Sequence, residues 1–355
     1  MENLIKMIKK LPPENKRLFR RIFRVEEVTG KLVIPKSLQN YVKTSFGGLQ
    51  QVEKQKIVKI INVVTGESSI FNEIRGLRKI EAKSEVGLPK DEMVERKKEC
   101  FFCNPLDKTP EDVFGRVKGK YCITASNLAK YAEFHAIVVF NRHNPLKFSL
   151  EEFSDYLQTS LRWFKEANKV DEKAIYPFFI WNCLWKAGAS IIHGHAQITL
   201  TRKPYQKVES LRKNIKKYRE KYGSEYFEDI FKIHSFLGLG LCLENVKVIV
   251  YLTPLKEKEI MVFSKNLNEK FMEVLYKILD YYLKIGVESF NLCIFMPPLK
   301  PVKGWEKFPY IARILDRGRL ETKTSDIGGM EIYASNIVST NLFNLAENLK
   351  NYFSL

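Results

Sequence analysis

The sequence contains few histidines and no long hydrophobic run. Only five of its 355 residues are histidine, which excludes a protein with several histidine-built metal sites. No apolar run approaches the ~20 residues that a membrane-spanning helix needs. The first residues, Met-Glu-Asn-Leu-Ile-Lys, lack the apolar core of a signal peptide. We therefore expect a cytoplasmic protein with no membrane-spanning helix.

Cysteines are few, and acidic residues are fewer than basic ones. Six cysteines in 355 residues are too few for the dense disulfide framework of a small secreted scaffold. Basic residues outnumber acidic ones, and the formal charge of +18 favours an anionic ligand, whether a nucleotide, a sugar phosphate or a nucleic acid. A hydrophobic content of 45% is ordinary for a globular chain, and the length suits two domains.

Three polar side chains alternate in the segment from Ile191 to Leu200, which its composition predicts to be a β-strand. The two-residue period of a strand points His193, His195 and Gln197 to one face. Core packing does not favour three polar side chains on one face, because each buried polar atom needs a hydrogen-bond partner. The pattern predicts a polar site, and small residues just before it suit a close approach of the backbone to a ligand. The alternative is a solvent-facing polar strip on an edge strand.

The run from Asn182 to Gln197 resembles the active-site segment of the galactose-1-phosphate uridylyltransferase family, a branch of the histidine-triad superfamily. The resemblance rests on Asn182, Ser190 and the His-x-His-x-Gln motif at their observed spacing. The usual middle residue of the motif is proline, whereas this chain has Gly194, which we expect to loosen the backbone without removing a chemical group. The resemblance implies an α+β fold of antiparallel sheets with packed helices.

The order of predicted elements repeats once along the chain, which indicates two tandem histidine-triad-like modules. We expect an N-terminal helical extension at 1–55, a catalytic module with the zinc site at 56–205, and a second module at 206–355. The first module opens with a hairpin near Thr65-Gly66. Strands are predicted at 120–125, 135–140, 176–183 and 191–200 around a helix at 150–167, and then at 246–252, 259–263, 290–295 and 310–315 around a helix at 268–285.

Cys100 and Cys103 form a Cys-x-x-Cys pair, which places two thiolates on one metal ion and needs two further ligands for a closed tetrahedral site. The resemblance supplies His143 and His193 as those ligands and implies a structural zinc. A redox-active cysteine pair is the main alternative. It is disfavoured because no thioredoxin-like βαβ pattern surrounds the pair.

His195 is implied by the resemblance to be a nucleophile that attacks the α-phosphorus of a nucleotide sugar. A neutral imidazole suits this chemistry, since its ordinary pKa of about 6.5 leaves it mostly unprotonated near pH 7. Charge that builds on the phosphate oxygens needs fixed donors. The donors that match the family pattern are Gln197, Ser190, Asn182, Arg75 and Arg78. Asn127 lies where the family holds the nucleoside, and Glu331 keeps the Gly-x-Glu core of the sugar-contacting segment.

The second module departs from well-studied bacterial members of the family. It has no histidine at 308–313, where those members carry ligands of a second metal ion. The aromatic and basic neighbours of Glu331 are also replaced, so the sugar is not identified by the sequence.

Three functions follow from these observations. The first is a nucleotidyltransferase that moves UMP or AMP between sugar 1-phosphates. The second is a phosphorylase of the same family that uses inorganic phosphate on an ADP-sugar or a dinucleoside polyphosphate. The third, suggested by the net charge, is a nucleic-acid-binding or 5′-adenylate-processing protein. It is disfavoured because the aromatic residues fall mostly on core faces. For the first two functions the resemblance also implies a homodimer.

Overall fold

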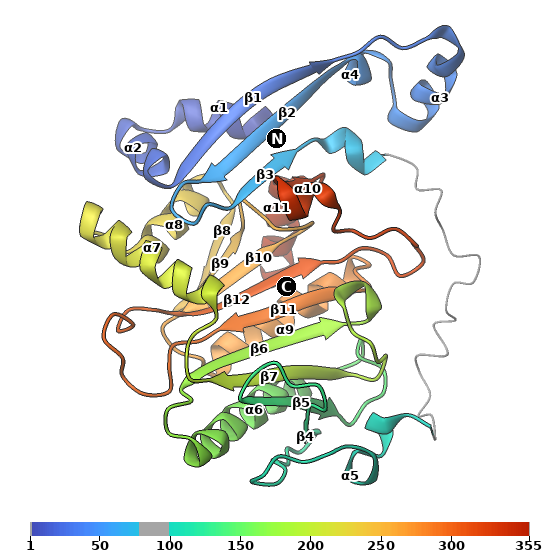
Figure 1. Ribbon diagram of the computed structural model, residues 1–355. Helices are drawn as coiled ribbons and strands as arrows, with labels where there is room; N and C mark the ends of the chain where they lie inside the picture. Colours follow the sequence, from blue (N-terminus) through green and yellow to red (C-terminus); the bar gives the residue numbers. More distant parts are fainter. Residues whose placement is uncertain (1, 78–98, 355) are drawn as a thin grey trace.

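Two β-sheets and their helices make up the protein (Figure 1), whose computed structural model describes residues 2–77 and 99–354. The larger sheet has nine strands in the order β4-β5-β7-β6-β11-β12-β10-β9-β8, and every neighbouring pair is antiparallel. Its strands are β4 (Cys122–Ser126), β5 (Phe134–Phe140), β6 (Tyr176–Cys183), β7 (His195–Thr201), β8 (Gly240–Leu243), β9 (Val246–Val250), β10 (Ile260–Ser264), β11 (Phe290–Phe295) and β12 (Tyr310–Asp316).

The strand order shows the repeat that the sequence predicts. The first module contributes β4-β5-β7-β6, and the second contributes β9-β10-β12-β11 in the same internal order. The two halves join edge to edge through β6 and β11, so that one sheet runs through both modules. The domain boundaries at 55/56 and 205/206 stay a prediction, because a continuous sheet crosses from one module to the other.

One long helix covers the same face of the sheet in each module. Helix α6 (Leu150–Val170) begins at a capping box, in which Ser149 and Glu152 satisfy each other's backbone N–H groups. Its counterpart is α9 (Glu269–Lys284), capped by Asn268. Both bury an apolar stripe against the sheet. Further helices of this region include α5 (Pro105–Lys108), α7 (Gln206–Tyr222), α8 (Tyr226–Phe236) and α11 (Leu342–Ser354).

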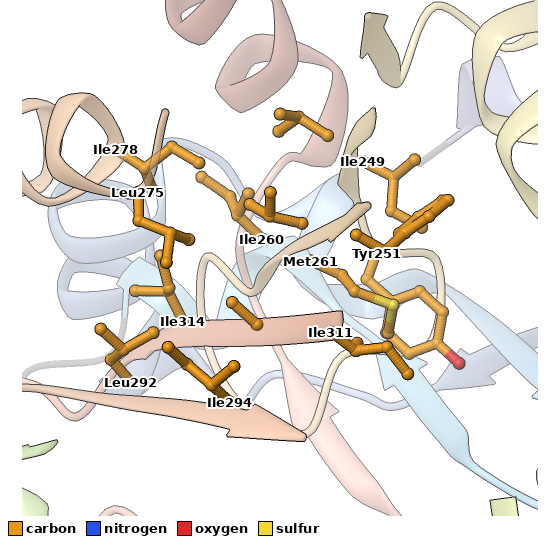
Figure 2. Packing of buried hydrophobic residues seen from close by; sticks show 14 of the residues in the cluster. Ile249, Tyr251, Ile260, Met261, Leu275, Ile278, Leu292, Ile294, Ile311 and Ile314 are labelled. Atoms are coloured by element: carbon orange, nitrogen blue, oxygen red, sulfur yellow. The ribbon is translucent and has the colours of Figure 1, made fainter. Parts of the chain in front are cut away.

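The core of the second module shows how strand alternation divides the side chains between the two faces. Figure 2 shows Leu275 and Ile278 of α9 pointing toward Ile260, Leu292 and Ile314 of the sheet. The three sheet residues stand in one row across β10, β12 and β11, and all five are fully buried. Because successive residues of a strand point to opposite faces, their neighbours face the other way. That opposite face carries the polar residues described below.

A smaller sheet packs over the second module and contains a strand that the sequence analysis missed. Its order is β1-β2-β3-β13. The segment predicted to be a helical extension does hold helices, but residues 23–31 are a strand paired with β2 along its whole length. Most β1 side chains are exposed, so no apolar alternation marks it. The elements are α1 (Glu2–Lys10), α2 (Pro13–Ile22), β1 (Phe23–Lys31), α3 (Lys36–Phe46), α4 (Gln50–Glu53), β2 (Lys54–Asn62), β3 (Ser68–Phe71) and β13 (Asn336–Val338).

A buried charged cluster ties the smaller sheet to the larger one. Arg313 of β12 forms ion pairs with Glu259 and with Glu67, which lies in the predicted β2–β3 hairpin. The hydroxyl of Tyr251 donates a hydrogen bond to Glu67 over 2.6 Å and accepts one from Asn62 over 3.0 Å. Removing the Arg313 guanidinium would take this counter-charge away from the carboxylates of Glu67 and Glu259, in a site away from water.

Exchange of Arg313 for methionine should therefore lower the free energy of unfolding by about 3–5 kcal/mol, the size expected when one partner of a buried ion pair is removed. Urea or guanidinium unfolding measures the change. The matched control is Arg319→Met, because Arg319 is exposed and its ion pair with Glu321 lies near the surface. Equal losses in the two variants would show that the cluster adds no stability.

Within the described ranges, no helix combines the length and the apolar character that crossing a membrane requires.

Candidate functional site

The His-x-His-x-Gln motif lies at the start of β7, an interior strand between β5 and β6. This position excludes the alternative of a polar strip on an edge strand. The strand begins at His195 and not at Ile191 as predicted, because residues just before it bond to the loop that follows β5. Gly194 N–H donates to the carbonyl oxygen of His143 over 2.9 Å.

Gly194 allows this close approach of two chain segments. A Cβ at this position would lie 2.7 Å from the Phe140 ring and 3.2 Å from the Arg142 carbonyl oxygen. The prediction that Gly194 loosens the backbone is therefore wrong, since its N–H and C=O are both bonded and its surroundings are tight. A proline would also lack the N–H that bonds to His143.

Four side chains from three segments meet beside the motif. Their ligand atoms all lie within 4.8 Å of one another, and they are Cys100, Cys103, His143 and His193. Cys103 lies in a short 3₁₀ turn, η3 (Phe101–Cys103), and His143 follows β5. The Cys103 sulfur is 3.3 Å from His143 Nδ1 and 3.4 Å from His193 Nδ1. The four residues that the sequence analysis grouped therefore form one cluster that can hold a metal ion.

The spacing of these atoms fits a tetrahedral ion. Zinc bond lengths of about 2.3 Å to sulfur and 2.0–2.1 Å to nitrogen put sulfur and nitrogen ~3.5 Å apart, and two nitrogens ~3.3 Å apart. The observed separations are 3.6 Å from Cys100 Sγ to His193 Nδ1 and 3.1 Å between the two Nδ1 atoms. His193 Nε2 lies 2.7 Å from the Phe140 carbonyl oxygen. A carbonyl only accepts, so the proton is on Nε2 and the Nδ1 lone pair faces the cluster.

His195 is held in the opposite tautomer, with its proton on Nδ1. That nitrogen donates to the carbonyl oxygen of His193 over 2.8 Å. The ring packs edge-on against Phe102, with centroids 5.1 Å apart, and burial lowers the pKa of His195 although this hydrogen bond raises it. Among the described residues, no group forms a hydrogen bond with Nε2 of His195. The side chain thus offers a neutral nitrogen with a free lone pair.

Gln197 stands on the same face as His195, two residues along β7. Its carbonyl oxygen lies 3.1 Å from the Tyr131 hydroxyl and 3.0 Å from His135 Nε2. His135 also contacts Asn127, whose Nδ2 is 3.1 Å from the same ring nitrogen. Sequence analysis identified Gln197 and Asn127 but missed Tyr131, in the loop before β5, and His135 on β5, because neither residue belongs to a local motif.

Asn182 lies on strand β6, which neighbours β7. Ile180 of β6 pairs with Gln197 at the end of the β6–β7 ladder, and Asn182 stands two residues further along β6, so its side chain is on the same face of the sheet as Gln197. The Asn182 side-chain oxygen accepts a hydrogen bond from Asn291 Nδ2 over 2.7 Å. Arg317 in turn donates to the Asn291 oxygen over 2.6 Å. These contacts leave the Asn182 amide N–H₂ to face a ligand, and the sequence analysis missed both supporting residues.

The other predicted residues form no hydrogen bond or ion pair with this group, or lie outside the described part. Ser190 and Arg75 are exposed, and Arg75 belongs to a 3₁₀ turn, η1 (Glu73–Leu77). Arg78 lies outside the described residues. Glu331 is in α10 (Gly329–Tyr333), where it contacts Lys256 Nζ over 3.4 Å. Burial opposes its ionisation, but the Gly328 N–H and Lys256 hold the pKa of Glu331 below its usual value.

Comparisons with known proteins identify the fold. No family model matches the chain, and no curated protein matches its sequence. An ADP-glucose phosphorylase from Arabidopsis thaliana with bound ADP-glucose has a TM-score of 0.61 at 16% identity, over 81% of this chain and 96% of its own. A GalT-like protein from the same plant has a TM-score of 0.58 at 17% identity, over 72% and 92%. A uridylyltransferase has a TM-score of 0.58 at 15% identity, over 83% and 98%.

These similarities confirm the predicted α+β fold of antiparallel sheets with packed helices. They also confirm, at the level of the fold, the resemblance to uridylyltransferases that the His-x-His-x-Gln motif indicates.

Proposed function

We propose that this protein is a nucleotidyltransferase that moves a nucleoside monophosphate, UMP or AMP, between sugar 1-phosphates through a covalent intermediate on His195. The observation that supports the proposal most directly is the state of His195. It is neutral, its proton is fixed on Nδ1, and its free Nε2 lies on a face that also carries two amide side chains. Such a nitrogen is a good nucleophile toward phosphorus.

The first half-reaction forms a bond from His195 Nε2 to the α-phosphorus of a nucleotide sugar. The bond from that phosphorus to the sugar phosphate oxygen breaks, and the departing sugar 1-phosphate takes the electron pair. The ring becomes cationic, and its Nδ1–H bond to the His193 carbonyl oxygen strengthens with that charge. In the second half-reaction an acceptor phosphate oxygen attacks the same phosphorus, and the nitrogen–phosphorus bond breaks.

Amide donors stabilise the charge that grows on the phosphate oxygens. Gln197 and Asn182 suit this role, because the carbonyl oxygen of each is already bonded within the protein and the N–H₂ remains for the ligand. We assign the outer phosphate contacts to Ser190, Arg75 and Arg78, the nucleoside side to Asn127 and the acceptor hydroxyls to Glu331. A carboxylate accepts two directional hydrogen bonds, which suits a sugar diol.

The residues of the metal cluster fit zinc, and we propose that Cys100, Cys103, His143 and His193 hold one zinc ion. Four protein ligands close a tetrahedral site, and a closed zinc site stabilises structure and does not activate water. The cluster draws together η3, the loop after β5 and the start of β7. Its role is therefore to fix the position of the segment that carries His195.

Intact-protein mass spectrometry after mixing with UDP-, ADP- or GDP-sugars tests the proposed function. The wild-type protein should gain the mass of one nucleoside monophosphate, and the base that gives the adduct identifies the donor. Isolated adduct is then offered a sugar 1-phosphate or inorganic phosphate. If a sugar 1-phosphate removes the nucleotidyl group from the protein, the enzyme is a transferase. If only inorganic phosphate removes it, the enzyme is a phosphorylase. Turnover of a nucleotide sugar with no adduct would contradict the covalent mechanism.

Exchange of Gln197 for methionine should slow adduct formation by roughly 10²- to 10³-fold, as the loss of one preorganised donor to an oxyanion does. Methionine keeps the length of the side chain and removes the amide. Rapid-quench measurement of the adduct gives the rate. The control is Gln158→Met, the same exchange on the exposed face of α6, which should keep the wild-type rate. A rate of adduct formation in Gln197→Met within about threefold of the wild-type rate would show that Gln197 does not stabilise the transition state.

A further inference from the structure

We propose that His135 is a positioning residue that sets which end of the Gln197 amide faces the ligand. The inference rests on the proposed function, because it takes the ligand to be a phosphate. An amide can present either N–H₂ or C=O, and only N–H₂ favours an anion. A group that fixes this choice determines whether Gln197 assists the reaction or opposes it.

The position of His135 is set by strand pairing. His135 lies on β5 opposite Thr199, and Ile137 lies opposite Gln197, so the imidazole is the diagonal neighbour of the Gln197 side chain on the same face. The ring is completely buried. Tyr131 covers it with a ring centroid 4.0 Å away. A side chain packed in this way has little freedom to turn.

Two potential donors converge on one atom of Gln197. His135 Nε2 is 3.0 Å from Gln197 Oε1, and the Tyr131 hydroxyl donates to the same oxygen over 3.1 Å. A carbonyl oxygen has two lone pairs and accepts both bonds. With Oε1 engaged twice, the Gln197 N–H₂ is directed away from His135 and toward the open part of the face.

Burial of Nδ1 and the contact with Gln197 both favour a proton on Nε2 of His135. Nδ1 is buried and has no partner among the described residues. A proton on Nδ1 would bury an unpaired N–H, whereas a proton on Nε2 is bonded to Gln197. Burial lowers the pKa of His135, so the ring is neutral and has only one proton to place.

Asn127 favours the other tautomer. Its side-chain oxygen accepts from Ala129 N–H over 2.9 Å, which leaves its amide nitrogen 3.1 Å from His135 Nε2. If Nε2 accepted from Asn127, Gln197 would have to turn its N–H₂ toward the ring and present its carbonyl to the phosphate. The two tautomers therefore give Gln197 opposite polarity toward a ligand, and the Nε2–H form is the one that supports phosphate binding.

Selective ¹⁵N-glutamine labelling of the full chain tests the contact directly and needs no turnover. The chain has seven glutamines, and the Gln197 side-chain signal is the one that disappears in Gln197→Met. We expect this signal to move in His135→Met, which removes the donor. In His135→Gln it should stay close to its wild-type position, because glutamine has the length of methionine and restores an N–H. An unmoved Gln197 signal in His135→Met would overturn the proposal.

The same two variants test the consequence for the reaction. Adduct formation should be about tenfold slower in His135→Met, the size of one lost hydrogen bond, and within about threefold of wild type in His135→Gln. Both variants should melt at similar temperatures, since their side chains have the same length. If adduct formation slows equally in His135→Met and His135→Gln, the loss comes from changed packing and not from the lost hydrogen bond to Gln197, which overturns the proposal.

These outcomes separate the inference from the proposed function. If the wild-type protein forms no adduct, the proposed function fails. The ¹⁵N signal of Gln197 still shows whether His135 fixes the orientation of the Gln197 amide. If wild type and His135→Met form the adduct at the same rate, the function stands and the positioning role falls.

Discussion

Exchange of His195 for asparagine should abolish the nucleotidyl adduct and leave the protein folded with the proposed zinc ion bound. The amide of asparagine keeps a donor near the position of Nδ1–H, so the bond to the His193 carbonyl oxygen can persist. It has no nitrogen lone pair that attacks phosphorus, because the amide nitrogen shares its electrons with the carbonyl group. The expected effect is complete loss of the covalent intermediate, larger than the loss of any single donor.

The measurement is intact-protein mass spectrometry of the variant with the nucleotide sugar that labels the wild type. Elemental analysis and thermal unfolding show whether zinc and fold are retained. The matched control is His234→Asn, because His234 is buried in α8 against Phe23 and Tyr251, away from the site. The His234→Asn variant should be less stable than the wild type and should still form the adduct. An adduct on the His195 variant would mean that another residue is the nucleophile.

The sequence predicted well the elements whose signals are local. Strands β6 and β11 have the predicted bounds, and the capping box of α6 was visible as Ser149 followed by Glu152. Strand β1 was missed for a physical reason. Its side chains are mostly exposed, so its stability comes from backbone pairing with β2, which leaves no hydrophobic pattern.

The residues of the candidate site also divide into those that a local sequence signal identifies and those that it does not. A contiguous motif identified His193, His195 and Gln197, and the family resemblance added distant ligands that the structure brings together. Asn291 and His135 could not be found, because each acts through pairing across strands that are far apart in the chain. Such partners become visible only when the strand order and register are known.

The two modules carry different side chains on corresponding strands, although they share one strand order. Gln197, Ile180, Cys293 and Arg313 stand in one row across β7, β6, β11 and β12, so Arg313 faces the same side as Gln197. In the first module this side carries imidazoles and amides suited to phosphate chemistry. In the second, the corresponding strand carries a cation whose ion pairs hold the smaller sheet. The absence of histidine at 308–313 fits this structural use of the second module.

The metal cluster gives the second large expected effect. Exchange of Cys100 for serine should remove the zinc and lower the free energy of unfolding by on the order of 4 kcal/mol or more, the range that accompanies loss of a structural metal. Serine has the shape of cysteine, but its hydroxyl is a poor zinc ligand. Cys242→Ser is the matched control, because Cys242 is an exposed thiol outside the cluster.

Elemental analysis and denaturant unfolding, with and without a chelator, make this test specific. Chelator should lower the stability of wild type and of Cys242→Ser to that of Cys100→Ser, and should not change Cys100→Ser, which has no ion to lose. The adduct on any folded fraction of Cys100→Ser should still form on His195, because the proposed ion positions the strand and is not a reactant. Wild-type protein that contains no zinc after purification would show that the four residues do not hold the ion. A Cys100 variant as stable as the Cys242 variant would show that the cluster adds no stability through a metal.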